Sequence, residues 1–339
     1  MTKTLGVYTA VLHDRPLDAA LDAIKELGLN AAEINAGGFL PPTHIPNIDD
    51  IVESSTAAAD YLGLFAEKNI RIAGLNVNGN PLHPNPVIGD KHAADLRRAI
   101  RAAAALGQKR VVTMSGLPGG EPGSTRPNWV VNAWNSGALD VLDYQWDDVV
   151  VPFWKEIAAL AQEHDVKVAI EMHPQNVVFN PPTMLELIER VGTDFVGAEM
   201  DPSHLFWQWM DPIAAVEYLG DRVFHAAAKD VRINENAKIY GVLDDRFRRL
   251  APTEERVNLG GDEWVNEWPK DSAWDFVALG RGHDQEFWTD FLRALYRVDE
   301  NMAVNIEHED VSLGRIEGLQ VAADVLLTAA EAATVEVSV

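Results

Sequence analysis

The sequence has 339 residues, with 28 Lys and Arg against 52 Asp and Glu, which gives a formal net charge of −24 at pH 7. A hydrophobic content of 47% with 24% charged residues is typical of a globular chain and excludes disorder as the main state. The acidity argues against binding to a nucleic-acid backbone or an anionic membrane, because both need a basic face. The absence of cysteine excludes disulfides, Cys-ligated zinc, iron–sulfur clusters and thiol nucleophiles.

The first residues do not form a signal-type segment. Residues 1–6 lead directly into a strand-like run, without the apolar core of a secretory signal peptide. No stretch of the sequence approaches the roughly 18 apolar residues that a membrane span needs. We therefore expect a soluble, cytoplasmic protein.

Short apolar runs alternate with amphipathic segments along the chain, in the repeating order of strand and helix. The expected strands span residues 4–9, 31–34, 70–75, 110–114, 166–171, 195–200, 222–229 and 302–306. The expected helices span residues 17–27, 49–69, 91–106, 146–164, 182–191, 211–218, 284–297 and 315–332. A Gly/Pro-rich segment at 115–128 is too long for a tight turn, so we interpret it as a functional loop.

This alternation predicts the fold. Strict alternation implies parallel strands, and eight strand–helix units imply closure into a (β/α)8 TIM barrel of the α/β class. We expect a single domain over 1–339, with a polar insertion at about 231–282 between the seventh strand and its helix. An open doubly wound sheet is the competing interpretation. It is weakened because the turn after the first strand, at 8–13, lacks the G-x-G-x-x-G motif of dinucleotide-binding folds.

Acidic and imidazole side chains follow the last four strands, where a barrel carries its reactive groups. The four strand endings contain Glu171-Met-His173, Glu199-Met-Asp201-Pro-Ser-His204, His225-Ala-Ala-Ala-Lys229-Asp230 and Asn305-Ile-Glu307-His308-Glu309-Asp310. Side chains two residues apart share a face of a strand, so Glu171 and His173 point the same way, as do Glu199 and Asp201. Several unpaired carboxylates in one small volume would be costly. We therefore predict a shared site for Mn²⁺, Mg²⁺, Co²⁺ or Zn²⁺.

Other residues near the predicted mouth are candidates for substrate binding. Asn80 and His83 lie in a proline-stiffened loop, where they serve either turn geometry or hydrogen bonding at the rim. Aromatic side chains in or beside the loops are candidate walls for a sugar or an aromatic ligand, namely Trp129, Trp207, Trp209 and Trp288. His92 and His164 fall on predicted helices, and we expect both at the surface.

The four strand endings together resemble the xylose-isomerase-like barrel superfamily of sugar phosphate isomerases and epimerases, over nearly the whole chain. The resemblance implies a divalent metal held by Glu, Asp, His and Glu from the last four strands. The matching positions are Glu171, Asp201 and Glu307. Ala227 stands where many relatives carry the His of a His-x-Lys-Asp motif, so we assign His225, the nearest imidazole on the same face, as the fourth ligand. His204 is the competing ligand, and three protein ligands plus water is the other alternative.

Several loop motifs resemble, more narrowly, the larger subunit of bacterial C-glycoside deglycosidases. They are Asn78-Gly-Asn80-Pro-Leu-His83-Pro, Met114-Ser-Gly-Leu-Pro-Gly-Gly120, Pro127-Asn-Trp129 and Gly280-Arg-Gly-His283. Those enzymes cleave 3-oxo-glycosides together with a small partner subunit. The resemblance therefore implies a metal-dependent carbon–carbon lyase in a hetero-oligomer, for which we expect Mn²⁺ as the metal.

The expected chemistry is removal of the proton next to a ketone, with the metal stabilising the enolate. In a 3-oxo-C-glycoside, loss of the C2 proton permits elimination of the aglycone from C1. His173 is the first choice of base, because two residues at ~3.3 Å each place it about 7 Å beyond Glu171 along the strand. Lys229, His204 and His283 are candidates for substrate binding or acid assistance.

Two other functions stay open. A ketose 3-epimerase or sugar isomerase would use the same metal, with Glu171 and Glu307 as its two bases. A non-catalytic barrel subunit is the third hypothesis, and Ala227 favours it because it interrupts the ligand motif.

Overall fold

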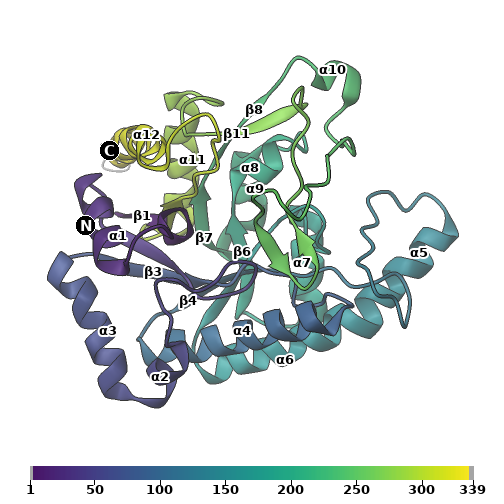
Figure 1. The fold of residues 1–339 in the computed structure, drawn as a ribbon, viewed down its shortest axis with the longest axis horizontal. Coiled ribbons are helices and arrows are strands. Elements are labelled where there is room, and N and C mark those ends of the chain that lie inside the picture. Colours follow the sequence, from purple (N-terminus) through teal and green to yellow (C-terminus); the bar gives the residue numbers. More distant parts are fainter. Residues whose placement is uncertain (1–2, 336–339) are drawn as a thin grey trace.

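The structure is a computed structural model that describes residues 3–335. Parallel strands close into a barrel in the order β1-β12-β7-β6-β5-β4-β3-β2 (Figure 1). The barrel strands are β1 Thr4–Tyr8, β2 Ala31–Asn35, β3 Arg71–Asn76, β4 Arg110–Met114, β5 Lys167–Glu171, β6 Val196–Met200, β7 Val223–Ala228 and β12 Ala303–Ile306. Every strand end lies within one residue of its predicted position. The TIM-barrel prediction is confirmed, and the open sheet is excluded.

Helices cover the outside of the barrel, except for the short α8 (Pro202–Phe206), which lies at the C-terminal mouth. They are α1 Leu17–Glu26, α2 Ile48–Glu53, α3 Ser55–Lys68, α4 Pro86–Ala105, α5 Ser136–Asp143, α6 Val151–Glu163, α7 Pro181–Val191, α8 Pro202–Phe206, α9 Pro212–Leu219, α11 Gln285–Val298 and α12 Arg315–Val335. A π-helical segment, Tyr144–Val150, joins α5 to α6, and 3-10 turns span Thr9–Leu12 and Gly220–Arg222. The apolar helix faces pack on the strands, and Trp154 is fully buried at this interface.

Two helices differ from the prediction because of local capping. The helix expected at 49–69 is divided at Ser54, whose backbone is extended (φ −132°, ψ 114°) and whose hydroxyl accepts a hydrogen bond from Ala57 N at 3.2 Å. The helix expected to begin at residue 91 begins at Pro86. Asn85 caps it through Val87 N at 3.1 Å, and proline suits the first helical position because its missing N–H is not needed there.

The insertion contains two short antiparallel strand pairs, of which only the second is a hairpin. Strand β8 (Asp230–Ile233) pairs with β11 (Trp274–Val277), and β9 (Asn258–Gly260) pairs with β10 (Glu263–Trp264). A short helix, α10 (Ala237–Tyr240), lies between them in sequence and forms the upper right corner in Figure 1. Strands of two to four residues are too short to show a hydrophobic period, which is why the sequence indicates only a polar insertion here.

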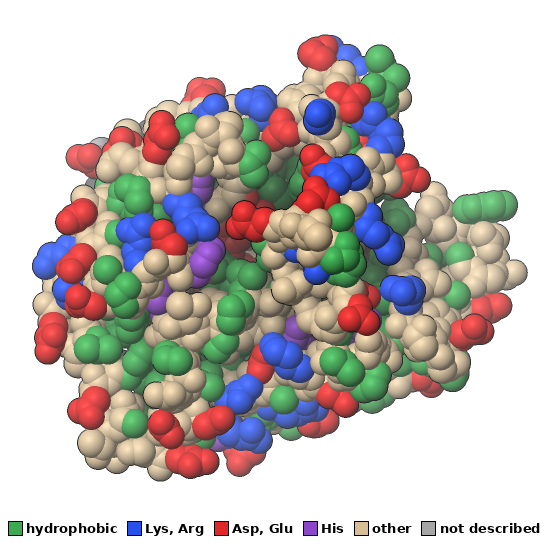
Figure 2. All heavy atoms as spheres, in the orientation of Figure 1, with side chains coloured by type: hydrophobic (Ala, Val, Ile, Leu, Met, Phe, Trp, Pro, Cys, Tyr) green, Lys and Arg blue, Asp and Glu red, His purple; other side chains and the backbone are tan. Residues whose placement is uncertain are grey.

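The negative charge is spread over the surface. Figure 2 shows Asp and Glu side chains across the visible face and its rim rather than in one patch. Many are paired; for example, Lys68 Nζ lies 2.8 Å from Asp18 and 2.7 Å from Asp22. Within residues 3–335, no helix combines the length and the apolar character needed to cross a bilayer.

Candidate metal centre

Three carboxylates meet at the C-terminal end of the barrel. Glu171 is the last residue of β5, Asp201 directly follows β6 and Glu307 directly follows β12. All three residues are buried, and one side-chain oxygen of each lies within 4.8 Å of those of the other two. Barrel closure brings them together because each ends an apolar parallel strand. The structure thus places the three predicted ligands side by side, while their role in metal binding stays a prediction.

His204 is the imidazole that joins this group. It lies in α8, whose N-cap is Asp201; Asp201 Oδ1 accepts a hydrogen bond from Ser203 N at 2.8 Å. His204 Nε2 lies 3.1 Å from Glu171 Oε1 and 3.3 Å from Asp201 Oδ2. The short helix therefore points the ring back over the strand ends. We take His204, the competing ligand of the sequence-based hypothesis, as the imidazole of the candidate centre.

His225 does not lie with the three carboxylates, which corrects its assignment as their fourth ligand. It is fully buried, and its Nε2 contacts Glu33 Oε2 at 2.7 Å. The reason is strand register: β7 pairs with β6 so that His225 lies opposite Glu199. The position two residues further along, next to Asp201, is Ala227, which has no donor atom. His225 consequently occupies a deeper layer of the barrel, about 7 Å below the strand ends.

Several buried polar atoms of the group have no hydrogen-bond partner within the described residues. They are Asp201 Oδ2, Glu307 Oε1 and both ring nitrogens of His204. Buried polar atoms are costly unless they are paired or coordinate a metal. Carboxylate oxygens and an imidazole nitrogen are donors that divalent Mn, Mg, Co and Zn accept. The donor set therefore fits a divalent cation.

Burial and neighbouring charges shift the pKa values of these side chains in different directions. Burial raises the pKa of Asp201 to about 7, and it raises the pKa of Glu307 well above its usual range although Lys229 opposes the shift. Burial would also raise the pKa of Glu171, but the contact with His204 and the nearby charge of Lys229 lower it to about 2. Burial lowers the pKa of His204 to about 3, so its ring is neutral at pH 7. Cation binding would displace the protons that the carboxyl groups hold.

Lys229 supplies positive charge at the edge of the centre. Its Nζ lies 2.7 Å from Glu309 Oε1, 3.2 Å from Glu307 Oε2 and 3.9 Å from Asp201 Oδ2. Burial opposes the charged form, yet these carboxylates raise the pKa of Lys229 well above its ordinary value. The predicted substrate-binding lysine is thus charged and is paired with a candidate ligand.

His173, the predicted base, lies beside the candidate ligands. Its ring centroid is 4.0 Å from that of His204, and it forms a second compact group of donors with Glu171 and His204. His173 Nδ1 lies 2.6 Å from the carbonyl oxygen of Pro174, which can only accept a hydrogen bond. Nδ1 therefore carries the hydrogen, which leaves Nε2 as the ring nitrogen that would take a proton.

The insertion forms one wall of the centre. Phe276 of β11 lies with its ring centroid 5.6 Å from that of His204 and 4.5 Å from Lys229 Nζ. Trp207 after α8 stacks on Trp274 of β11 at 4.8 Å, which attaches the insertion to the barrel.

Of the other tryptophans expected at the mouth, Trp209 is 82% exposed and Trp288 is fully buried in the core. Trp288 is therefore not a wall of the site.

Asn80 and His83 hold the loops of the rim. Asn80 Oδ1 accepts from Leu117 N at 2.8 Å and its Nδ2 donates to Leu117 O at 3.1 Å, which joins the loops after β3 and β4. His83 is buried, and its Nε2 lies 3.3 Å from Glu263 of the insertion. His92, expected at the surface, is buried beneath this loop and accepts a hydrogen bond from Asn80 N at 3.0 Å.

Trp129 lines an apolar pocket of about 170 Å³ between the long loop after β4 and the loop after β5. Its ring meets that of Phe179 edge to face at 5.5 Å, and Trp146 and Val177 complete the lining nearby. The pocket has the size and the apolar lining for a ring-sized ligand group.

Asp230 fixes the loop that carries His283. It is fully buried, and its Oδ2 accepts from Gly280 N, Gly282 N and His283 N at 3.0 to 3.1 Å. Its Oδ1 lies 2.7 Å from His283 Nδ1, and the His283 ring stacks on Phe206 at 3.6 Å. The carboxylate thereby fixes the orientation of the His283 ring, while the role of His283 in substrate binding stays a prediction.

Replacing Asp230 by Asn should destabilise the protein by about 2 kcal/mol or more, because an amide nitrogen cannot accept the hydrogen bonds of buried backbone N–H groups. Urea unfolding followed by circular dichroism would measure the loss. Asp221→Asn is a matched control, since that side chain is 92% exposed. Equal stability of the two variants would contradict this role for Asp230.

Sequence reasoning missed two polar side chains from the first half of the barrel. Asn78 Nδ2 donates to Glu171 Oε2, and Glu33 on β2 lies inside the barrel with its Oε1 accepting from Asn76 Nδ2 at 2.7 Å. The sequence does indicate polar groups inside the first half of the barrel. Glu33 interrupts the otherwise apolar run Ala31–Ile34, and Asn76 and Asn78, two residues apart, share one face of the chain.

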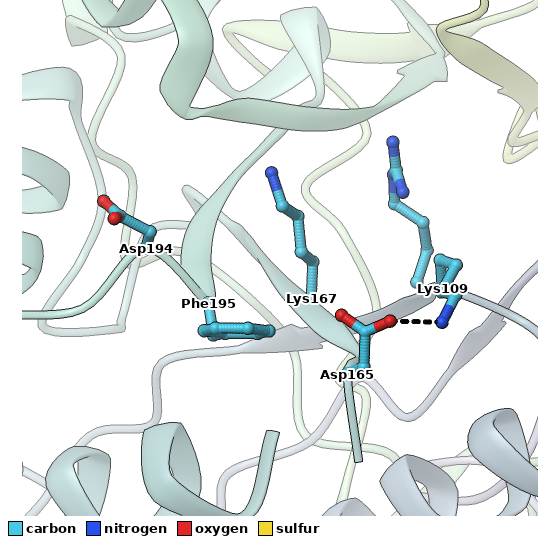
Figure 3. Close-up of a pocket in the computed structure, with 6 residues that line it drawn as sticks. Lys109, Asp165, Lys167, Asp194 and Phe195 are labelled. Atoms are coloured by element: carbon cyan, nitrogen blue, oxygen red, sulfur yellow. Dashed lines mark hydrogen bonds and ion pairs between the residues drawn. The ribbon is translucent and has the colours of Figure 1, made fainter. Parts of the chain in front are cut away.

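A hollow of about 280 Å³ lies at the opposite end of the barrel, where β4, β5 and β6 begin (Figure 3). It is lined by Lys109, Arg110, Asp165, Lys167, Asp194 and Phe195. The Lys109–Asp165 ion pair of 2.5 Å closes one side of it. Because TIM-barrel chemistry takes place at the C-terminal strand ends, this hollow is separate from the candidate centre.

Comparison with known proteins decides the family. The sequence matches the family model of the xylose isomerase-like TIM barrel over residues 21–329. The chain belongs to the xylose isomerase-like TIM barrel family. A member of similar length is the uncharacterized protein YfiH of Bacillus subtilis (strain 168), which is 32% identical over 326 residues, 95% of this chain and 97% of the relative.

Solved structures of xylose isomerase-like barrels share the fold. An L-ribulose 3-epimerase superposes with a TM-score of 0.61 at 11% identity, over 99% of this chain and 97% of the other. The 3-keto-D-glucoside 4-epimerase YcjR of E. coli gives 0.60 at 13% identity, over 97% and 100%. A Mycobacterium smegmatis barrel in complex with magnesium gives 0.58 at 15% identity, over 95% and 92%. At such identities the likeness concerns the fold alone.

Proposed function

We propose that this protein is a divalent-metal-dependent epimerase or isomerase that acts on a keto sugar or a keto-sugar derivative. The observation that carries the proposal is the buried group of Glu171, Asp201, His204 and Glu307 at the mouth of the barrel. Within it, Asp201 Oδ2, Glu307 Oε1 and both ring nitrogens of His204 have no hydrogen-bond partner among the described residues. Family membership supports it, as do the folds of two epimerases. We propose Mn²⁺ as the metal, because an oxygen-rich donor set without thiolate suits it.

A cation held by these residues would act as a Lewis acid toward a ketone oxygen and a neighbouring hydroxyl. His173, through Nε2, would take the proton from the carbon between them. In an epimerase a second group returns the proton on the other face. Glu171 and Glu307 enter the site from β5 and β12, which are separated by β6 and β7, so their carboxylates can approach a substrate from different sides.

The positive charge of Lys229 lies close to where the enolate would form. Its ammonium is 3.2 Å from Glu307 and is covered by Phe276, which keeps water away from it. In such a partly desolvated place a fixed charge stabilises a developing oxyanion more strongly than in water. Lys229 therefore supports proton abstraction without taking the proton itself.

A second candidate is a lyase that cleaves 3-oxo-glycosides, as the loop motifs resembling C-glycoside deglycosidases imply. The pocket lined by Trp129, Phe179 and Trp146 favours it, because an aglycone needs an apolar cavity next to the sugar. A small partner subunit belongs to this candidate. Exposed apolar side chains on the segment that projects with α5 to the right in Figure 1, Val131 and Trp134 at 47% and 84% exposure, offer it a contact surface.

Deuterium exchange tests the shared chemistry. Protein loaded with Mn²⁺ is incubated in D₂O with a free ketose and, separately, with a 3-oxo-glycoside, and the α-carbon is followed by NMR. Both candidate enzymes remove a proton from the carbon next to a ketone. We therefore expect metal-dependent incorporation of deuterium at that carbon, in whichever of the two substrate classes the protein accepts. Interconversion of sugars would support the epimerase, and release of the aglycone would support the lyase.

Protein treated with EDTA is the control, and exchange should return when Mn²⁺ is added back. Protein that binds Mn²⁺ yet exchanges no α-proton in either substrate class contradicts the enzymatic proposal and supports the non-catalytic barrel.

A further inference from the structure

A second group of buried acidic and imidazole side chains lies inside the barrel beneath the candidate metal centre. Glu33 on β2, Glu199 on β6 and His225 on β7 each offer a donor atom within 4.8 Å of the other two. Their exposed fractions are 1%, 0% and 0%. Glu199 precedes Asp201 by two residues and shares its face of the strand, so this group lies about 7 Å deeper than the first. It is separate from the residues assigned to the chemistry.

Glu33 is held firmly in place. Its Oε1 accepts a hydrogen bond from Asn76 Nδ2 at 2.7 Å, and its Oε2 contacts Asn305 Nδ2 at 3.0 Å and His225 Nε2 at 2.7 Å. The groups around this carboxylate are neutral amides and one imidazole. Within the described residues, it forms no ion pair with a lysine or an arginine. The side chains therefore fix the geometry of the group but supply little positive charge.

Glu199 lacks any such support. Neither of its carboxylate oxygens has a hydrogen-bond partner among the described residues, and His225 Nδ1 also has none. A carboxyl group that is fully buried and unpaired is costly in the interior of a protein. A second carboxylate, Glu33, lies within the same small volume and raises that cost. The free donor atoms of Glu199 and His225 are those that a cation would use.

We propose that Glu33, Glu199 and His225 bind a second divalent cation inside the barrel. Two carboxylates and one imidazole form a three-residue donor set of the kind that holds Zn²⁺ or Mn²⁺, and their combined negative charge offsets that of the ion. The ion lies below the substrate and takes no part in proton transfer. It joins β2 to β6 and β7 across the barrel and supports the strand ends that carry Asp201.

Metal stoichiometry tests the proposal. Protein is produced in medium containing Mn²⁺, passed through gel filtration and analysed for manganese per chain by mass spectrometry. We expect two manganese ions per chain for the wild type and one for Glu199→Gln. We also expect one for Glu307→Gln, because that variant loses the ion of the candidate metal centre. The double variant should contain none. Glu26→Gln, an exposed carboxylate on α1, is the matched control and should keep both.

Thermal stability gives an independent reading. Mn²⁺ should raise the melting temperature of Glu307→Gln, whose deeper site is intact, and should leave that of the double variant unchanged. If Glu199→Gln does not fold, as judged by circular dichroism, His225→Gln takes its place with the same expected loss of one equivalent. A wild type with a single equivalent that Glu199→Gln retains would overturn the second site and leave the proposed activity intact.

Discussion

Replacing Glu307 by Gln should remove the catalytic cation and lower turnover by about 10³-fold or more, while the barrel still folds. Glutamine keeps the shape of the side chain and one donor oxygen but loses the charge that holds the ion. Burial and the nearby carboxylates of Glu171 and Asp201 raise the pKa of Glu307, so the metal-free wild type favours the protonated carboxyl, which glutamine resembles; the metal-free variant should therefore be about as stable as the metal-free wild type. Metal analysis, turnover and urea unfolding measure the three effects separately.

A suitable control for this variant is Glu300→Gln, an exposed position just before the same strand. It changes the net charge equally and should alter neither metal content nor turnover. Full activity of Glu307→Gln would refute the ligand assignment. Simultaneous loss of metal, activity and folded structure would show that Glu307 is needed for folding rather than for binding the ion alone.

Replacing His173 by Ala should lower turnover by about 10²- to 10⁴-fold while the protein retains its metal, which is the contribution of a general base. The position of His173 beside His204, at a ring-centroid distance of 4.0 Å, and the contact of its Nδ1 with Pro174 O are the reasons for this expectation. Exchange of the α-proton with D₂O should fall by the same factor, since that exchange needs the base as well as the metal, which this variant retains. Rate measurements under saturating Mn²⁺ exclude an indirect effect through weaker metal binding.

His164→Gln serves as the control for His173, because His164 caps the C-terminus of α6 at the opposite end of the barrel. Unchanged turnover in His173→Ala would show that His173 is not the base. Glu171 and Glu307 would then be the remaining candidates for that role. Loss of the metal together with turnover would instead identify His173 as a ligand, in agreement with its membership of the Glu171–His173–His204 group.

Much of the architecture could be predicted because it depends on local periodicity. The apolar runs around Val111 and Val168 predict buried parallel strands, and the spacing of Glu171, Asp201 and Glu307 at the ends of such runs predicts that they meet. Local capping escaped the prediction, since the break at Ser54 and the early start at Pro86 depend on single side-chain hydrogen bonds. A helical pattern of apolar residues does not contain that information.

The choice between His204 and His225 could not be made from the sequence. Both belong to an apolar strand or the segment just after one, and both precede further polar residues. The decision depends on where each ring lies along the barrel axis: the pairing of Glu199 with His225 places one imidazole in the deep layer, and the turn of α8 returns the other to the mouth. Glu33, far away in sequence, comes close to His225 only when the barrel closes.

The sequence alone determined the class of fold, the positions of the strands and the three acidic residues that end them, because these follow from side-chain alternation and hydrophobic period within each segment. Only the tertiary structure decided which imidazole joins those residues, that Phe276 of the insertion covers them, and that a second acidic layer lies beneath. The physical reason is that the register between neighbouring strands fixes how far along the barrel axis each side chain lies. That register depends on all the strands together, so no single segment of the sequence contains it.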